Sequence, residues 1–200
     1  MTKPGHDEPY RERLRMRLIE AAQSVMITDG FSAVQARRIA GDGACSVGTL
    51  YNIFGDIDGL ILAVNERTLD ELGHALEAAT STGASHDLKT RLMALATAYL
   101  DFATAHPRRW RAVFEHRLPQ GTQVPAFYVA DRQRLLSLIE TQIAGAIPGA
   151  ASRSIAAHAL FSAVHGIVML SLDEKLGDFD PVQCQRQIRF IVENVARGLR

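Results

Sequence analysis

The chain contains 200 residues, of which 47% are hydrophobic, and its 22 basic and 22 acidic residues give no net charge at pH 7. This length and apolar content are enough for one sizeable domain, or for one domain with a small appendage. The balanced charge argues against a uniformly basic nucleic-acid-binding protein, although arginines cluster locally within residues 11–17 and 37–38.

The N-terminal part of the chain is predicted to form three helices. Apolar residues at three- and four-residue spacing indicate an amphipathic helix over residues 11–28, which ends at Gly30. Two short helices follow over residues 35–40 and 46–54, separated by a glycine-containing turn. Helices of two turns are marginal alone, so they must pack against the first helix.

The rest of the chain is also predicted to be helical, since no period-two strand pattern competes anywhere. The predicted helices cover residues 56–78, 86–105, 107–116, 126–146, 152–172 and 181–199. The sequence therefore predicts an all-α fold of about nine helices. We expect an N-terminal helix-turn-helix domain over residues 1–56 and a C-terminal helical bundle over residues 57–200.

The two short helices and their turn form a candidate helix-turn-helix unit. Ile39 and Ala40 are predicted to face inward from the first short helix, and Leu50 and Phe54 from the second. Ser46 is a good N-cap for the second helix, because its hydroxyl can accept a hydrogen bond from an early backbone N–H. In such units the second helix enters the DNA major groove.

These residues resemble the DNA-binding domain of tetracycline-repressor-type (TetR) transcriptional regulators. The matching residues are Gly30, Phe31, Ile39, Ala40, Ser46, Gly48, Thr49, Leu50, Tyr51, Phe54 and Leu60. Residues 105–115 and 161–172 resemble the C-terminal domain variant that is named for its tryptophan-histidine-glycine motif. Phe161 stands in the place of the tryptophan, before His165 and Gly166.

The resemblance implies a homodimer that binds a palindromic operator and releases it when a small molecule enters the C-terminal domain. The DNA contacts that it implies are Gln35, Arg37, Ser46, Val47, Gly48, Thr49, Tyr51 and Asn52. The effector contacts that it implies are Tyr99, Phe102, Trp110, Phe114, Phe127, His165 and Met169. The aromatic residues among these could equally be ordinary core, and His165 with Gly166 could be a packed core pair.

The last two helices, at about residues 154–172 and 181–199, carry more apolar surface than one core face needs. An isologous four-helix interface between two copies explains this excess, and the resemblance implies the same homodimer.

The sequence departs from the family pattern at three positions. Val34 replaces a capping threonine, and Ile57 replaces a lysine that touches phosphate. Ala44 stands where the turn needs a glycine in the left-handed conformation, unless the turn shifts so that Gly43 takes that role. Residues 1–60 carry 7 basic and 8 acidic side chains, so we expect weaker DNA binding than a basic domain would show.

Other kinds of site find little support. The two cysteines, Cys45 and Cys184, lack the spacing of a disulfide framework or a zinc site, and no two histidines lie four residues apart. Cys45 is interpreted as inert packing between the short helices, with a thiol sensor as the alternative. The glycines of residues 41–48 lack the pattern of a phosphate-binding loop.

The polar N-terminal segment is not a secretory signal, and polar residues interrupt the longest apolar stretch, residues 156–172. We therefore expect a cytoplasmic protein that is not an enzyme and uses no metal, cofactor or membrane. The alternatives to a ligand-responsive repressor are a ligand-binding protein whose DNA-reading unit has decayed, or a helical enzyme. An enzyme would need a nucleophile–base pair or a metal set, and the sequence shows none with persuasive spacing.

Overall fold

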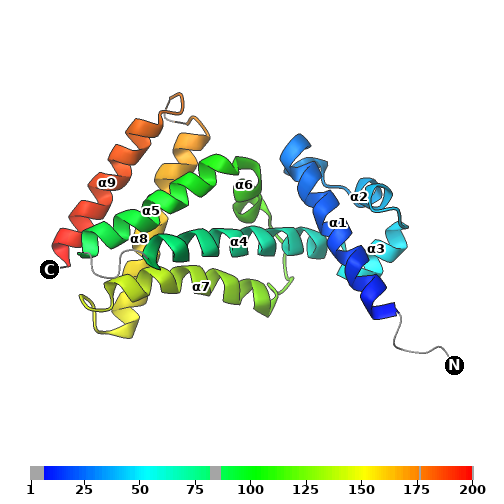
Figure 1. Cartoon of the computed structure of the whole chain (residues 1–200), viewed down its shortest axis with the longest axis horizontal. Helices are drawn as coiled ribbons and strands as arrows, with labels where there is room; N and C mark the ends of the chain where they lie inside the picture. The colour runs from blue at the N-terminus through cyan, green and yellow to red at the C-terminus, as the bar shows by residue number, and fades with distance from the viewer. Residues whose placement is uncertain (1–6, 82–86, 176, 200) are drawn as a thin grey trace. The chain divides into compact units, whose positions relative to one another are not determined.

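The computed structural model describes residues 7–81, 87–175 and 177–199 (Figure 1). These residues form nine α-helices, one short 3-10 helix and no strand, which confirms the predicted all-α fold. The helices are α1 (Asp7–Asp29), η1 (Phe31–Ala33), α2 (Ala36–Asp42), α3 (Val47–Phe54), α4 (Ile57–Ser81), α5 (Leu88–Ala105), α6 (Pro107–Glu115), α7 (Ala126–Ile143), α8 (Ala150–Leu172) and α9 (Pro181–Gly198).

Several predicted helix ends were wrong by a few residues. α1 begins at Asp7 and not at residue 11. α7 ends at Ile143, three residues early, because its carbonyl accepts hydrogen bonds from the N–H groups of residues 146 and 147 in a closing turn. The predicted start of α5 at His86 lies outside the described residues. The helix begins at Leu88, after Asp87 accepts a capping hydrogen bond.

The described chain packs as two compact units. The first contains the described residues through Leu69 together with Arg108–Tyr128, and the second contains Asp70–Pro107 and the described residues from Val129 onward. α4 therefore contributes its first half to one unit and its second half to the other. The functional boundary after residue 56 stays a prediction.

The core of the first unit is the apolar face of α1, covered by α2, α3 and the first half of α4. Its buried residues include Leu14, Leu18, Ile19, Ala22, Val25, Met26, Ile39, Ala40, Leu50, Leu60, Ile61 and Val64. Three of the predicted inward residues are among them, whereas Phe54 is only half-buried, at the end of α3. Burial of Leu50 fixes which side of α3 turns away from the core.

α6 belongs to this first unit. The Arg108 guanidinium donates hydrogen bonds to the carbonyls of Ile27 (2.7 Å) and Thr28, in the last turn of α1. These carbonyls have no donor within the helix, so the arginine acts as a side-chain cap. The buried Asn65 amide of α4 donates to the Ala112 carbonyl at 3.2 Å. α6 is thus fixed to both α1 and α4.

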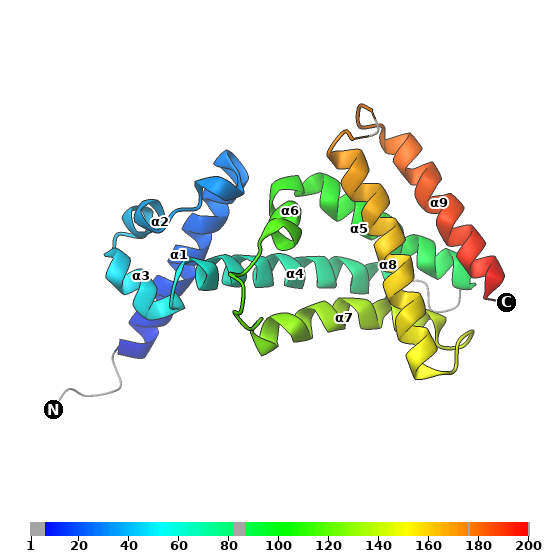
Figure 2. The same ribbon diagram turned by 180° about the vertical axis from the view of Figure 1, so that it is seen from behind.

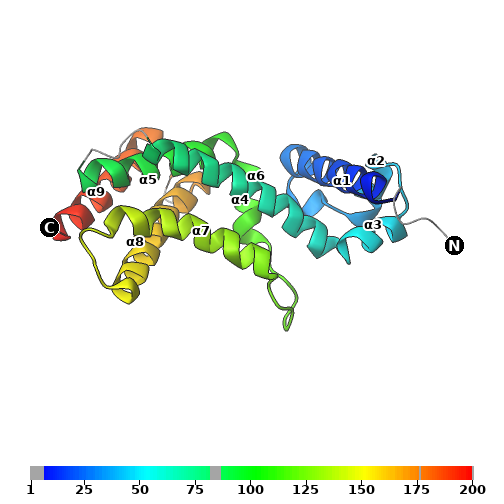
Figure 3. The ribbon, with the colours of Figure 1, turned by 60° about the horizontal axis from the view of Figure 1, so that its bottom comes forward.

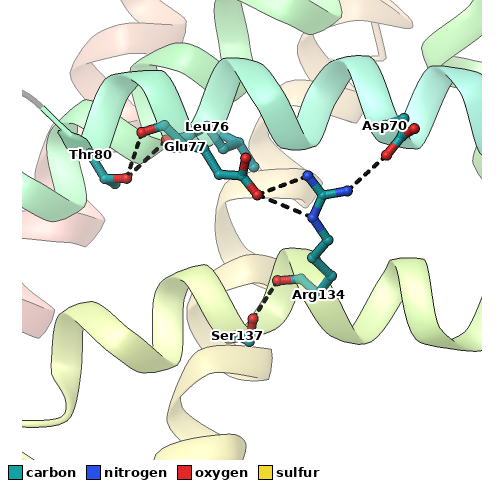
Figure 4. A network of polar contacts seen from close by, with 6 residues as sticks. All are labelled: Asp70, Leu76, Glu77, Thr80, Arg134 and Ser137. Atoms are coloured by element: carbon teal, nitrogen blue, oxygen red, sulfur yellow. Dashed lines mark hydrogen bonds and ion pairs between the residues drawn. The ribbon is translucent and has the colours of Figure 1, made fainter.

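The second unit is a bundle in which α9 runs beside α5 and α8 (Figures 1 and 2). α7 lies along the second half of α4 (Figure 3). Arg134 of α7 joins these two helices, because its guanidinium donates to Glu77 at 2.9 and 3.1 Å and to Asp70 at 2.8 Å (Figure 4). Asp70 and Glu77 are two turns apart, and therefore lie on the same face of α4.

α8 is an unusually apolar helix of which only four residues, Ala157, Leu160, Val164 and Val168, are buried. By length and composition alone it could cross a membrane, with a mean hydropathy of 1.8 over an 18-residue window. Only 22% of that window is buried within the described chain. The sequence had not indicated this, because polar residues interrupt the stretch. Apolar surface that stays exposed is typical of sites that contact a protein partner or a membrane.

The turn between α2 and α3 adopts the first of the two conformations that the sequence allowed. Ala44 has a φ of +52°, while Gly43 has a φ of −81°. Gly43 is needed for another reason, since a Cβ atom there would overlap the Leu18 side chain of α1 and lie 3.2 Å from the Ile39 carbonyl oxygen. The close approach to α1 therefore favours glycine at position 43, although it is Ala44 that adopts the left-handed conformation.

We predict that Ala44→Gly stabilises the protein by about 1 kcal/mol, because it removes the steric cost of a left-handed residue that carries a Cβ atom. Gly43→Ala should destabilise it, because Leu18 or the turn must move. Chemical denaturation of the full chain, followed by circular dichroism, measures both. A lower stability for Ala44→Gly would show that this turn is not strained.

Candidate nucleic-acid interface and effector site

The start and end of α3 are set by local hydrogen bonds. The Ser46 Oγ accepts from the Thr49 backbone N–H at 3.0 Å and lies 2.9 Å from the Thr49 Oγ1. At the other end Gly55, with a φ of +84°, donates to the Tyr51 carbonyl and closes the helix. The predicted cap is confirmed, and it fixes a helix of eight residues.

None of the predicted DNA-contact residues is buried. Tyr51 is 41% exposed, which is high for a large aromatic side chain in a packed unit. Gln35, Arg37, Ser46, Gly48, Tyr51 and Asn52 are exposed, and Val47 and Thr49 are half-buried. The structure therefore leaves all eight beside solvent, at the start of α2 and on α3.

The start of α2 lacks a side-chain cap, as the sequence predicted. Gln35 occupies the N-cap position and makes no capping hydrogen bond with its side chain. Val34 is buried, and its side chain has no acceptor to offer. The first N–H groups of α2 are consequently open to an acceptor from outside the chain.

The two adjacent arginines of α2 have different surroundings. Arg38 forms an ion pair with Asp29 at the end of α1, and the hydrogen bond from Arg38 lowers the pKa of the Asp29 carboxyl group. Arg37 is exposed. Arg38 thus holds α2 against α1, and Arg37 is the more accessible of the two.

α1 contributes two arginines that the sequence motif does not contain. Arg11 donates a hydrogen bond to the Asn52 carbonyl at 3.1 Å. The Arg15 guanidinium carbon lies 5.9 Å from the centroid of the Phe54 ring. The signal in the sequence was the four-residue spacing of these arginines, which places them on one face of a helix. Their proximity to α3 could not be predicted, because 41 residues separate Arg11 from Asn52.

The predicted effector residues fall into both units. In the first unit Trp110 is fully buried, and its ring centroid lies 5.4 Å from that of Phe114. Phe127 is 44% exposed, whereas its neighbour Tyr128 is buried. The Tyr128 hydroxyl donates to the Val113 carbonyl at 3.3 Å, so it ties the start of α7 to α6.

In the second unit the structure brings Tyr99 and His165 directly together. The Tyr99 hydroxyl lies 2.7 Å from the His165 Nδ1, and the Phe161 ring stacks on the imidazole with centroids 5.5 Å apart. Phe102 instead packs against His106, and Met169 is half-buried on α8. Desolvation lowers the pKa of His165, so its imidazole is neutral near pH 7.

A neutral imidazole paired with a phenol can serve two purposes. As a buried hydrogen bond it fixes α8 against α5. It also provides a polar contact within an apolar and aromatic surrounding, which is the usual composition of a small-molecule site. Both interpretations that the sequence left open for His165 therefore agree with this geometry.

Neither cysteine lies in a metal or disulfide site within the described residues. Cys45 is half-buried and packs against the core of the first unit, with its Sγ 3.5 Å from the Ser46 carbonyl oxygen. Cys184 is buried. This packing agrees with the interpretation of Cys45 as a filler between the short helices.

Three N-terminal helices, of which the third is exposed and capped, followed by further helices, are the architecture of the helix-turn-helix class. Residues 92–195 match the family described as "Tetracyclin repressor-like, C-terminal domain". The match covers more than half of the chain, so the chain belongs to the tetracycline-repressor-like (TetR) family and is a transcriptional regulator.

Two related sequences extend the likeness beyond the C-terminal domain. An HTH-type transcriptional regulator of Mycobacterium tuberculosis is 25% identical over 166 residues, which cover 83% of this chain and 73% of that protein. The HTH-type transcriptional activator FasR of Mycolicibacterium smegmatis is 32% identical over 122 residues, covering 61% of this chain and 54% of that protein.

Solved structures share the fold over almost the full length. A protein of unknown function from Rhodococcus sp. RHA1 superposes with a TM-score of 0.74 at 26% identity, covering 92% of this chain and 94% of that one. The TetR family regulator PfmR from Thermus thermophilus superposes with a TM-score of 0.60 at 18% identity, covering 92% of this chain and 99% of that one. The second likeness concerns the fold alone.

The lowered pKa of His165 predicts the pH dependence of stability. The unfolded chain binds a proton at this imidazole near pH 6.5, whereas the folded chain resists protonation until a lower pH. The contribution of His165 to stability is therefore complete above about pH 6.5 and declines as the pH falls. Urea unfolding at pH 7.5, 6.5 and 5.5 should show a smaller loss for His165→Gln than for the wild type. An identical loss in both would contradict the prediction.

Proposed function

We propose that this regulator binds a palindromic operator as a homodimer, represses transcription there, and leaves the DNA when a small molecule binds its C-terminal bundle. The observation that carries the proposal is the exposed α3, which Ser46 caps and Leu50 anchors in the core. Such a helix presents its outer side chains on a rigid support, as a major-groove reader requires. Action on chromosomal DNA implies a cytoplasmic location.

The exposed side chains divide into two groups of DNA contacts. Thr49 and Tyr51 bind phosphates, and Gln35 approaches the backbone at the start of α2. Arg37 can donate two hydrogen bonds to a guanine edge, and Asn52 can pair with adenine. The first group positions the protein and the second gives sequence specificity.

The N-terminal end of α3 approaches the DNA most closely in this proposal. Gly48 has no side chain and lies exposed beside Val47, so the helix can come near the base edges. The Ser46 hydroxyl is already held by Thr49, which leaves it as a helix cap that also faces the DNA backbone.

We predict that Tyr51→Ala weakens operator binding at least tenfold and leaves stability almost unchanged, because the ring is 41% exposed and contributes little to the core. A gel shift with the DNA upstream of the protein's own gene, together with thermal unfolding, measures both. Ile27→Ala is the control, since this apolar side chain of the same unit is 48% exposed and lies on α1. Unchanged operator binding by Tyr51→Ala would contradict the assignment of α3 as the helix that reads the DNA.

The proposed dimer interface uses α8 and α9, at about residues 154–172 and 181–199. Ile155 is 72% exposed and Phe190 is 67% exposed, which leaves large apolar side chains uncovered on both helices. The exposed positions of α8 between Ile155 and Leu170 are His158, Ala159 and Ser162, so no lysine, arginine or carboxylate lies on this face of α8. On α9, exposed Arg186 and Arg189 lie near Phe190 in the sequence and would border the apolar contact. In an isologous interface the same faces of two copies meet, so these four helices would bury one another.

We predict that the double variant Ile155→Asp/Phe190→Asp is monomeric at micromolar concentration, because the two-fold axis repeats each charge in the apolar interface. Analytical ultracentrifugation reports the mass, and circular dichroism shows whether the fold is kept. Val124→Asp, an exposed apolar position before α7, is the control and should stay dimeric. A dimeric double variant would contradict this interface, and binding of the wild type to lipid vesicles would assign the face to a membrane.

The effector proposal rests on the Tyr99–His165 pair of the second unit. A ligand that is mainly apolar, with one hydrogen-bonding group, would suit this pair and the Phe161 ring. Phe102 and Met169 are the further contacts that we propose on α5 and α8. The predicted effector contacts of Trp110, Phe114 and Phe127 stay predictions. These three residues lie in the first unit, where Trp110 and Phe114 pack with each other.

A ligand-binding protein with a decayed DNA-reading unit is the second candidate. The uncapped start of α2 and the left-handed Ala44 are the observations that favour it. A footprint on the DNA upstream of the protein's own gene distinguishes the two, since only a regulator protects a site there.

A further inference from the structure

The segment that follows α3 carries negative charge and no cation. Asp56 accepts a hydrogen bond from the Gly59 N–H at 2.8 Å, and Asp58 lies 2.9 Å from the His116 Nε2. Ile57, between them, packs against the core. The last carbonyls of α3 add the partial negative charge of a helix C-terminus. A DNA phosphate that approached this end of α3 would be repelled unless another element supplied positive charge.

α1 supplies that charge from a distant part of the sequence. The Arg11 Nη2 donates to the Asn52 carbonyl at 3.1 Å, in the last turn of α3. A guanidinium has five N–H donors in one plane, and this hydrogen bond uses one of them. Because the side chain is exposed, the other donors are accessible to an oxyanion.

One turn further along α1, Arg15 occupies the same face but has different partners. Its guanidinium lies over the Phe54 ring, and its Nη1 lies 3.6 Å from a Glu12 carboxylate oxygen. These contacts hold Arg15 against the end of α3 and pair its guanidinium with a carboxylate. Arg15 is therefore a positioning residue, and Arg11 has the more accessible cation.

We propose that Arg11 binds a phosphate of the DNA backbone at the C-terminal end of α3. The inference rests on the proposed DNA-binding function. A guanidinium that holds both the α3 backbone and a phosphate fixes the position of the reading helix along the duplex, and its planar donors suit a phosphate. Arg11 thereby supplies the positive charge that is missing at Ile57.

The other arginines of the first unit serve as comparisons. Arg13 is two residues from Arg11 and from Arg15, which places it on the opposite side of α1, and it is exposed. Arg38 forms an ion pair with Asp29. Arg13 therefore provides a control with the same charge and the same helix, away from α3.

The test is the salt dependence of DNA affinity, measured by fluorescence anisotropy between about 50 and 300 mM salt, the range in which phosphate contacts dominate. The probe is the shortest duplex from upstream of the gene that the wild type protects in a footprint. For Arg11→Gln we expect about tenfold weaker binding and a log–log slope shallower by about two per dimer, one for each protomer. Arg11→Lys should keep most of the slope, and Arg13→Gln should match the wild type.

A second duplex of unrelated sequence provides a further check. The same loss of slope should occur on it, because a phosphate contact does not depend on base sequence. Thermal unfolding separates binding from a purely structural role. If Arg11→Gln lowers stability but keeps the wild-type slope, Arg11 only caps α3 and the inference is overturned.

The outcomes also distinguish this inference from the function on which it depends. Wild-type binding with an unchanged slope in Arg11→Gln would overturn the role of Arg11 alone. If the wild type protects no site upstream of the gene in the footprint, the proposed DNA-binding function is overturned, and the role of Arg11 with it.

Discussion

The close contact between the α2–α3 turn and α1 is the constraint on which the first unit depends. Two helices of 7 and 8 residues cannot persist alone, so they are stable only while Ile39 and Leu50 stay buried against α1. Gly43 permits that contact because it has no Cβ atom to meet Leu18. The next residue, Ala44, adopts the left-handed conformation. The exposed side of α3 follows from the same packing, since burying Leu50 turns Tyr51 and Asn52 outward.

The N-terminal segment has no excess of positive charge, and some of its charged side chains form ion pairs with one another. Residues 1–60 are almost neutral, yet several of their carboxylates have partners within the fold. Asp29 forms an ion pair with Arg38, Asp56 accepts a hydrogen bond at the start of α4, and Asp58 contacts His116. Arg11 and Arg37 are exposed within the same near-neutral segment. A near-neutral domain can thereby present local positive charge to DNA, because the field at a phosphate depends on the nearest unpaired groups.

The second unit shows two surfaces of opposite character. Inside it, Tyr99 satisfies the His165 imidazole, so that a polar group is tolerated among aromatic rings. Outside it, α8 and α9 leave Ile155 and Phe190 uncovered. The Tyr99 hydrogen bond explains why the polar imidazole is tolerated in the interior. The exposure of Ile155 and Phe190 has no comparable explanation within one copy of the described chain. A second copy would remove this apolar surface from water.

Local sequence patterns were enough to predict the helices, the inward residues Ile39, Ala40 and Leu50, and the Ser46 cap. These features depend on residues within one or two turns of each other, where periodicity and capping chemistry are decisive. Local patterns could not predict that Arg11 contacts Asn52, that α6 packs in the first unit, or that Ala44 and not Gly43 is left-handed. They also could not predict that the expected effector residues divide between two units. Each of these depends on how distant segments pack, and no local pattern encodes which side chains will meet.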